Sequence, residues 1–177
     1  MKNTLKSKLK KIKLLALDVD GILTDGSINI DSNGEEFKIF DVQDGFGIVF
    51  FRRAGFKVAI ISARSANAVT ARAKDLGIDR VYQDQKNKVS AYEELKKEFA
   101  ISDEEVCFMG DDLPDLGVLN RVGLPVTVPN AVEEVKSVCI YVTKKNGGRG
   151  AIREVVEMIL KSQEKWEGIV KAMSSIK

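Results

Sequence analysis

Polar side chains stand directly after several short apolar runs of the 177-residue sequence. The first run is followed by an Asp-x-Asp-Gly motif, the second by a serine, the third by a lysine, and the fourth by Gly-Asp-Asp and one further aspartate. In open α/β sheets ligands bind beyond the carboxyl ends of the strands, so side chains in such positions are expected to meet. The residues concerned are Asp18, Asp20, Ser62, Lys88, Asp111, Asp112 and Asp115.

These residue types are the ones that phosphoryl transfer needs. A carboxylate can attack phosphorus in line with the leaving oxygen and form an acyl phosphate, and Asp18 is the candidate nucleophile. Asp20 lies on the same side of an extended chain and can protonate the leaving alcohol, then deprotonate the attacking water. Gly21 allows a tight turn with free amides. Lys88 and the Ser62 hydroxyl are predicted to hold the remaining phosphate oxygens.

Carboxylates and a phosphate group repel each other unless a cation stands between them. Magnesium prefers about six oxygen ligands and keeps several waters, so one or two carboxylates suffice. We expect Asp18 and Asp111 to bind the metal directly. Asp112 and Asp115 are expected to lie next to these ligands without binding the metal themselves. The predicted cofactor is therefore Mg²⁺.

Each feature taken singly has a simpler explanation. Asp-x-Asp-Gly and Gly-Asp-Asp segments also form turns or helix caps, and a serine after a strand commonly caps a helix. A single lysine is usually a solvated surface residue. Their order after successive strands favours a catalytic site over coincidence.

The composition excludes other chemistries. The sequence contains no histidine, which removes Ser-His-Asp hydrolysis and metal sites built on imidazole. Cys107 and Cys139 lie in apolar surroundings and are interpreted as core thiols of a protein in a reducing compartment, so we expect the cytoplasm. The net charge of +2 is near balance, and no apolar run approaches the roughly 18 residues of a membrane span. We therefore expect neither nucleic acid nor membrane as a partner.

Apolar runs alternate with amphipathic segments along the chain. This alternation predicts an α/β fold with a doubly wound, mostly parallel sheet. Residues 27–30 and 37–40 flank an Asp-Ser-Asn-Gly turn and predict a β-hairpin. The expected strands are 14–18, 57–62, 81–82, 106–109, 124–128 and 140–142, and the expected helices are 45–54, 66–76, 88–99, 114–122, 131–137 and 152–160.

The two ends of the chain differ from this pattern. Residues 1–12 are rich in lysine and are interpreted as a solvated basic arm, the alternative being a docking tail. Residues 13–162 form the expected catalytic domain. The tail, 163–177, holds Trp166 and further apolar residues at helical spacing, so we expect it to extend the last helix and to pack on a neighbouring subunit.

The segments Asp18-Val19-Asp20-Gly21, Ser62, Lys88 and 110–115 resemble the four motifs of the haloacid-dehalogenase-like (HAD) phosphatase superfamily. The resemblance covers about residues 13–162. It implies a Rossmann-like fold and an aspartyl-phosphate intermediate on Asp18. It also implies magnesium held by Asp18, Asp111 and the backbone carbonyl of Asp20.

Three segments, 18–26, 44–47 and 147–151, resemble one branch, the family of 3-deoxy-D-manno-octulosonate 8-phosphate phosphatases. This resemblance implies hydrolysis of that sugar-acid phosphate in lipopolysaccharide precursor synthesis. It also implies that a β-hairpin, about 27–40, replaces a cap domain. Hairpins from four subunits would pack together in a homotetramer whose neighbours close each other's sites.

Substrate contacts follow from the same resemblance, and cationic side chains suit a substrate that carries both carboxylate and phosphate. A related branch that acts on nine-carbon sugar-acid 9-phosphates has glutamate where Arg64 stands. Many members have asparagine and arginine where this chain has Asp41 and Gln43. The implied contacts are Asp41, Val42, Gln43, Asp44, Gly45, Arg64, Arg72 and Arg149.

Other functions stay open at this point. They are a phosphatase for a nine-carbon 9-phosphate, a broad phosphomonoesterase and, outside the enzymes, a phosphoaspartate receiver-like switch. The switch is disfavoured by Asp20, because an acid and base next to the nucleophile would hydrolyse the phosphoaspartate. Arg72 could also be a solvated helix charge, and Arg149 the flank of a helix N-terminus.

Overall fold

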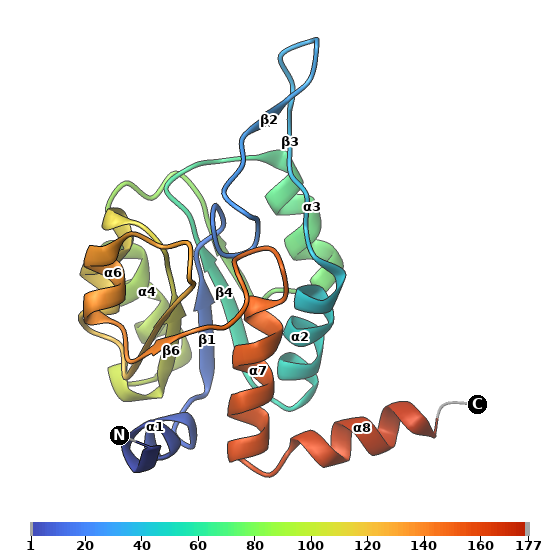
Figure 1. Cartoon of the computed structure of the whole chain (residues 1–177), viewed down its shortest axis with the longest axis vertical. Helices are drawn as coiled ribbons and strands as arrows, with labels where there is room; N and C mark the ends of the chain where they lie inside the picture. Colours follow the sequence, from blue (N-terminus) through green and yellow to red (C-terminus); the bar gives the residue numbers. More distant parts are fainter. Residues whose placement is uncertain (1, 176–177) are drawn as a thin grey trace.

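A six-stranded parallel sheet runs through the centre of the molecule, in the order β5-β4-β1-β6-β7-β8 (Figure 1). The computed structural model describes residues 2–175. The chain moves outward from β1 to β5 and then returns to the other side of β1, so the predicted doubly wound sheet is confirmed. The strands are β1 (Leu14–Leu17), β4 (Lys57–Ile61), β5 (Arg80–Tyr82), β6 (Val106–Met109), β7 (Leu124–Thr127) and β8 (Tyr141–Val142).

The register aligns the carboxyl ends of the central strands β4, β1 and β6. Leu17 pairs with Ile60 of β4 on one side and with Met109 of β6 on the other. The amide of Asp18 donates to the carbonyl of Met109 at 2.9 Å and so continues the ladder by one residue. Because the direction of winding reverses at β1, the residues after these three strands border the crevice where ligands bind in such sheets.

Helices cover both faces of the sheet in two groups (Figure 1). Helix α2 packs against α3 and α7, while α5 packs against α4 and α6. All residues of β1 and β6 are buried, as expected of strands covered on both sides. These helices are α2 (Val42–Arg53), α3 (Asn67–Leu76), α4 (Lys88–Phe99), α5 (Leu116–Leu119), α6 (Glu133–Val138) and α7 (Ala151–Ser162).

The predicted hairpin forms β2 (Asn29–Ile30) and β3 (Glu36–Phe37), which pair antiparallel and project from the body (Figure 1). Its turn is closed by the Asp31 carboxylate, which accepts hydrogen bonds from the amides of Asn33 and Glu35. Gly34 has a φ of 82° there, a conformation that glycine adopts without steric cost.

The N-terminal segment differs from the expected solvated arm. Residues Lys2–Leu9 form helix α1, which contacts α7. Leu9 and Ile12 are buried, and Lys8 Nζ donates to the carbonyl of Gly123 at 2.8 Å. Leu9 and Ile12 lie three residues apart, so they share one face of the segment, and this face packs on the body. The many lysines of the segment suggested a fully solvated arm.

The C-terminal segment is a separate helix, α8 (Trp166–Ser174), and does not extend α7. The turn between them has Glu164 at a φ of 59°. The Trp166 ring meets Phe50 of α2 edge-on, with centroids 6.1 Å apart, and the Arg153 guanidinium lies 5.0 Å from the Trp166 centroid.

A 3-10 turn breaks the helix expected at 114–122. The chain forms η2 (Leu113–Asp115) before α5 begins, and a second 3-10 turn, η1 (Asp103–Glu105), precedes β6. The cause is Asp115, whose side chain turns back to the amides of Asp111 and Asp112.

Within residues 2–175, none of the helices combines the length and the apolar character needed to cross a bilayer.

Candidate active site

The side chains predicted to do chemistry meet in one cleft of about 300 Å³ at the carboxyl ends of β1, β4 and β6. The hairpin side of the cleft adds Gly26 and Ile28, which the sequence did not indicate. The predicted residues that line it are Asp18, Asp20, Ser62, Arg64, Lys88, Asp111, Asp112 and Asp115.

A buried lysine lies between two buried carboxylates at the base of the cleft. Lys88 Nζ is 2.7 Å from Asp18 Oδ1 and 2.6 Å from Asp115 Oδ1. Lys88 is the first residue of α4, which is capped by the Asn87 side chain. Burial lowers the pKa of Lys88, but the charges of Asp18 and Asp115 raise it by more, so its pKa lies above the ordinary value. The ammonium therefore stays charged at the base of the cleft.

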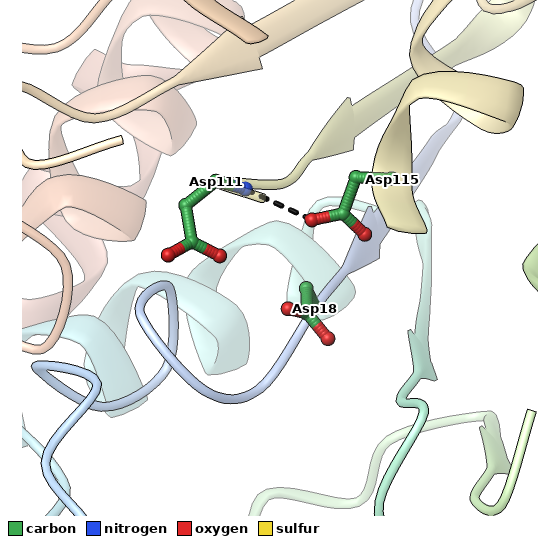
Figure 2. Close-up of side chains that lie close together, drawn as sticks. All are labelled: Asp18, Asp111 and Asp115. Carbon is green, nitrogen blue, oxygen red and sulfur yellow. Dashed lines mark hydrogen bonds between the residues drawn. The ribbon is translucent and has the colours of Figure 1, made fainter. Parts of the chain in front are cut away.

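Asp115 shapes the loop after β6. Its Oδ2 accepts a hydrogen bond from the amide of Asp111 at 2.9 Å (Figure 2). It also accepts one from the amide of Asp112 at 3.2 Å. These bonds turn the loop so that the Asp111 carboxylate points into the same space as Asp18. Asp115 is 1% exposed, and a Cβ on Gly110 would lie 2.5 Å from its Cγ, so only glycine fits before the turn.

Gly21 brings the loop after β1 against Asp111. Its φ is 92°, and a Cβ there would lie 1.9 Å from Asp111 Oδ2. Two further glycines support this loop from the other side, because Cβ atoms at Gly147 and Gly148 would clash with the backbone of Gly21 and Thr24. The loop after β1 is thus packed backbone to backbone on Gly147 and Gly148, and directly against the Asp111 carboxylate.

The electrostatics of this cluster call for a cation. Burial and the charge of Asp115 raise the pKa of Asp18 to about 7, although Lys88 acts in the opposite direction. Burial and the charge of Asp18 likewise raise the pKa of Asp111 to about 7. Within the described part of the chain, Asp111 Oδ1 is buried without a hydrogen-bond partner. A bound cation would give this oxygen a partner and favour both ionised forms.

The donor set fits a divalent cation that prefers oxygen. Asp18, Asp111 and Asp115 each place one carboxylate oxygen within 4.8 Å of the others. Both Asp115 oxygens already accept hydrogen bonds, from Lys88 and from the two loop amides, so Asp18 and Asp111 remain the candidates for direct ligands. The Asp20 carboxylate is not part of this group.

Ser62 presents its hydroxyl to the cleft from the end of β4. Its amide donates to the Tyr82 carbonyl at 2.8 Å, which continues the sheet by one residue. Its Oγ accepts from the Arg64 amide at 3.2 Å, so the hydroxyl hydrogen is available to a ligand. The arrangement suits a hydrogen bond to a phosphate oxygen.

The hairpin supplies two charged residues that the sequence analysis missed. Lys38 Nζ lies 2.5 Å from Asp20 Oδ1 and 2.9 Å from Glu36 Oε1, and its side chain is only 2% exposed. Glu36 Oε2 also accepts from Arg64 at 2.7 Å. The sequence holds one indication of them. Glu36 and Lys38 are two residues apart, so in an extended strand their side chains point to the same side.

Comparison with known proteins agrees with this geometry. Residues 80–156 match the model of the haloacid dehalogenase-like hydrolases. The chain is 45% identical over 159 residues to the 3-deoxy-D-manno-octulosonate 8-phosphate phosphatase of Escherichia coli (strain K12). The aligned residues cover 90% of this chain and 85% of that protein.

The chain belongs to the haloacid dehalogenase-like hydrolases. It is a phosphatase of this family, and two solved structures of relatives resemble it closely.

The 3-deoxy-D-manno-octulosonate 8-phosphate phosphatase of Moraxella catarrhalis, in complex with a magnesium ion, a phosphate ion and a KDO molecule, has a TM-score of 0.95 and 43% identity over 98% of this chain and 99% of that one. The cobalt-bound deoxy-D-mannose-octulosonate 8-phosphate phosphatase of Haemophilus influenzae has a TM-score of 0.86 and 38% identity, over 89% and 92%.

The segment 41–45 is absent from the lining of the phosphatase cleft within the described chain. Asp41 caps α2 by accepting from the amides of Gln43 and Asp44. Val42 is exposed at the first turn of α2, and the Gln43 amide oxygen accepts from Lys145 Nζ at 3.4 Å.

Asp44 is buried and joins α2 to α7. Its carboxylate accepts from the amides of Gly150 at 3.0 Å and Arg153 at 2.8 Å, which are free donors of the α7 N-terminus. Burial raises the pKa of Asp44 to about 6, even though these amides favour the ionised form. The residue therefore holds the 147–150 loop in place behind Gly21.

The two remaining predicted arginines are paired outside the cleft. Arg72 pairs with Asp75 on α3, and its guanidinium fills the space in which a Cβ of Gly45 would stand. Arg149 pairs with Asp25 at 2.9 Å and is largely exposed.

Gly21→Ala is expected to weaken divalent-cation binding by roughly 10–100-fold, the usual range for a change in the surroundings of a metal ligand. The added Cβ would overlap Asp111 Oδ2 and push the ligand away. Titration calorimetry with MgCl₂ would measure the effect.

Gly34→Ala is the matched control, because Gly34 also has a positive φ but has nothing within 4 Å of a Cβ. Equal cation affinities of the two variants would contradict this account of Gly21.

Asp44→Asn is expected to destabilise the chain more at pH 4 than at pH 7.5. The folded pKa of about 6 lies above the ordinary 3.8, so the folded chain holds the proton more tightly. The stability that Asp44 contributes therefore falls as pH rises from about 4 to 6, and asparagine removes this titration. The difference between the two pH values should be about 2 kcal/mol, from ~1.4 kcal/mol per pKa unit.

Urea unfolding of both proteins at the two pH values would measure it. Asp31→Asn is a control of opposite sign, since hydrogen bonds from the Glu35 and Asn33 amides lower the pKa of exposed Asp31. A destabilisation by Asp44→Asn that is equal at both pH values would show that Asp44 does not titrate in this range.

Proposed function

We propose that the chain hydrolyses 3-deoxy-D-manno-octulosonate 8-phosphate to the free sugar acid and inorganic phosphate, with Mg²⁺ as its cofactor. The observation that carries the proposal is the buried Asp18–Lys88–Asp115 triad beside the unpartnered Asp111 oxygen. It stands in a chain 45% identical to an enzyme of that name.

The residues of the cleft divide the reaction between them. Asp18 attacks phosphorus and forms an aspartyl phosphate while the bond from phosphorus to the ester oxygen breaks. Asp20 gives its proton to that oxygen and then takes a proton from the water that hydrolyses the intermediate. Lys88 and Ser62 hold the remaining phosphate oxygens. Magnesium, when held by Asp18 and Asp111, would neutralise charge between the carboxylates and the phosphate.

Arg64 is our candidate for recognising the substrate carboxylate. It lines the cleft and pairs with Glu36, and its side chain is 47% exposed, whereas that of Lys88, the other cation in the lining, is 2% exposed. A planar guanidinium can bind a carboxylate through two hydrogen bonds, which supports a sugar acid as substrate over a neutral sugar phosphate.

The test is phosphate release from a panel of phosphomonoesters with and without magnesium. The panel holds the eight-carbon 8-phosphate, a nine-carbon sugar-acid 9-phosphate, hexose phosphates and phosphoserine. We expect strong preference for the first, loss of release without magnesium, and a loss of kcat of at least 10³-fold in Asp18→Asn, since the nucleophile is gone. Arg64→Glu should lower kcat/KM for the eight-carbon substrate most.

Other outcomes point elsewhere. Similar activity on every compound of the panel would support the proposed mechanism but contradict the proposed substrate. Preference for the nine-carbon substrate would place the chain in the related branch that acts on nine-carbon sugar-acid 9-phosphates. Magnesium-dependent labelling of Asp18 without turnover would favour a phosphoaspartate switch.

We also propose a homotetramer in which the hairpins pack together. The hairpin and the start of α2 expose a run of large apolar side chains, more than a monomer of this size needs. In this assembly Asp41, Val42 and Gln43, together with Arg72 and Arg149, would contact substrate at a neighbouring subunit's site, while buried Asp44 and Gly45 hold that segment in place. The exposed residues are Ile28, Ile30, Phe37, Ile39, Val42 and Phe46.

Ile30→Asp is expected to shift the mass measured by light scattering from tetramer toward monomer, because a charge would be buried in the hairpin contact. Ile140→Asp, at an exposed apolar residue away from the hairpin, is the control. A tetramer that survives the first substitution, or a wild-type monomer, would refute the assembly.

We place the reaction in lipopolysaccharide precursor synthesis in the cytoplasm. The cysteines Cys107 and Cys139 are both free thiols, as suits a reducing compartment. Recovery of the protein in the periplasmic fraction of cells would contradict this location.

A further inference from the structure

Asp20 takes its charged partners from two loops outside its own. Asp20 follows β1 by three residues, and no hydrogen bond from its own loop reaches its carboxylate within residues 2–175. Its Oδ1 accepts from Lys38 of the hairpin at 2.5 Å, and its Oδ2 lies 3.8 Å from Arg64 Nε after β4. The position of this carboxylate thus depends on residues distant in the sequence.

These partners form a closed ring of alternating charge. Lys38 also pairs with Glu36 Oε1 at 2.9 Å, and Glu36 Oε2 pairs with Arg64 at 2.7 Å, which returns to Asp20. Two carboxylates and two cations balance within the ring. Three short contacts, of 2.5, 2.9 and 2.7 Å, join the hairpin to the loops after β1 and β4, and the longer contact of 3.8 Å closes the ring.

Lys38 is the buried member of the ring. Its side chain is 2% exposed, whereas that of Arg64 is 47% exposed. Burial lowers the pKa of Lys38, but hydrogen bonds and charge from Asp20 and Glu36 outweigh it and raise the pKa above the ordinary value. A buried ammonium that donates to both carboxylates cannot move without leaving one of them unpaired, so it is a rigid support.

The ring distinguishes the two oxygens of Asp20. Oδ1 is held by Lys38, while Oδ2 has only the 3.8 Å contact, which is too long for a hydrogen bond. Oδ2 is therefore the Asp20 oxygen that accepts no hydrogen bond from the described residues.

We propose that Lys38 is the positioning residue for the general acid Asp20, so that the hairpin takes part in proton transfer within its own subunit. This inference rests on the proposed function. In the step concerned, an Asp18 oxygen bonds to phosphorus, the bond to the ester oxygen breaks, and the proton on Asp20 Oδ2 moves to that oxygen. Lys38 holds Oδ1 and gives up no proton.

The leaving group tests this role. A sugar alkoxide must be protonated as it departs, whereas nitrophenolate departs readily without a proton. Lys38→Met should therefore lower kcat/KM for 3-deoxy-D-manno-octulosonate 8-phosphate by roughly 10–100-fold, a part of the usual contribution of a general acid. The value for 4-nitrophenyl phosphate should change little, and phenyl phosphate should fall between them. The quantity kcat/KM is used because it reports the steps up to alcohol release.

Lys38→Arg should restore most of the sugar-phosphate activity, since it keeps the charge and the donors. Lys13→Met is the matched control, because Lys13 is exposed and pairs with Glu105 away from the cleft. Thermal unfolding establishes that each variant is folded, and if the methionine variant is not, Lys38→Gln replaces it in the comparison with Lys38→Arg.

An equal loss for all three phosphates, or no loss for any, would overturn the proposal. An equal loss would give Lys38 a purely structural role. A wild-type enzyme inactive on all three would instead refute the proposed function, so the two failures are distinguishable.

Discussion

The interaction on which the rest of the site depends is the burial of one ammonium between two carboxylates. Lys88 contacts Asp18 at 2.7 Å and Asp115 at 2.6 Å, where water has largely been excluded. A carboxylate buried without such a partner would take up a proton and lose its value as a nucleophile. Lys88 compensates part of that cost, yet burial still raises the pKa of Asp18 to about 7. The remaining imbalance is what a cation at Asp111 would remove.

The surrounding loops are held by backbone contact and by buried caps, not by a large apolar core of their own. Asp115 turns the loop after β6 through two amide hydrogen bonds, and Gly21 lets the loop after β1 approach Asp111. Asp44 holds the N-terminus of α7, whose preceding glycines pack on Gly21. Because Gly21 packs directly on the Asp111 carboxylate and Gly147 packs on Gly21, a side chain added at either glycine would displace the carboxylate or the loop that faces it.

Part of this arrangement could be predicted from sequence because it follows local rules. Apolar runs of strand length marked β1, β4 and β6, and the residues after them lie together since parallel strands end at one edge. Other features could not be predicted. The packed face of α1 was concealed by its lysines, and the η2 turn arises from a side chain that reaches back to its own loop. Lys38 and Glu36 were missed because an alternating hairpin strand does not say which of its faces meets the catalytic loop.

The sequence by itself determined the sheet, the hairpin and the types of residue that stand after each strand, because apolar spacing and turn residues act over a few positions. Only the tertiary structure decided which charges are paired. Lys38 reaches Asp20 across 18 residues, and Lys88 reaches Asp115 across 27. Such pairs depend on how separate segments pack, and ion pairing changes steeply with distance and burial. For the same reason the burial of Asp44, which the family resemblance implies as a substrate contact, came only from the folded chain, where its carboxylate caps α7.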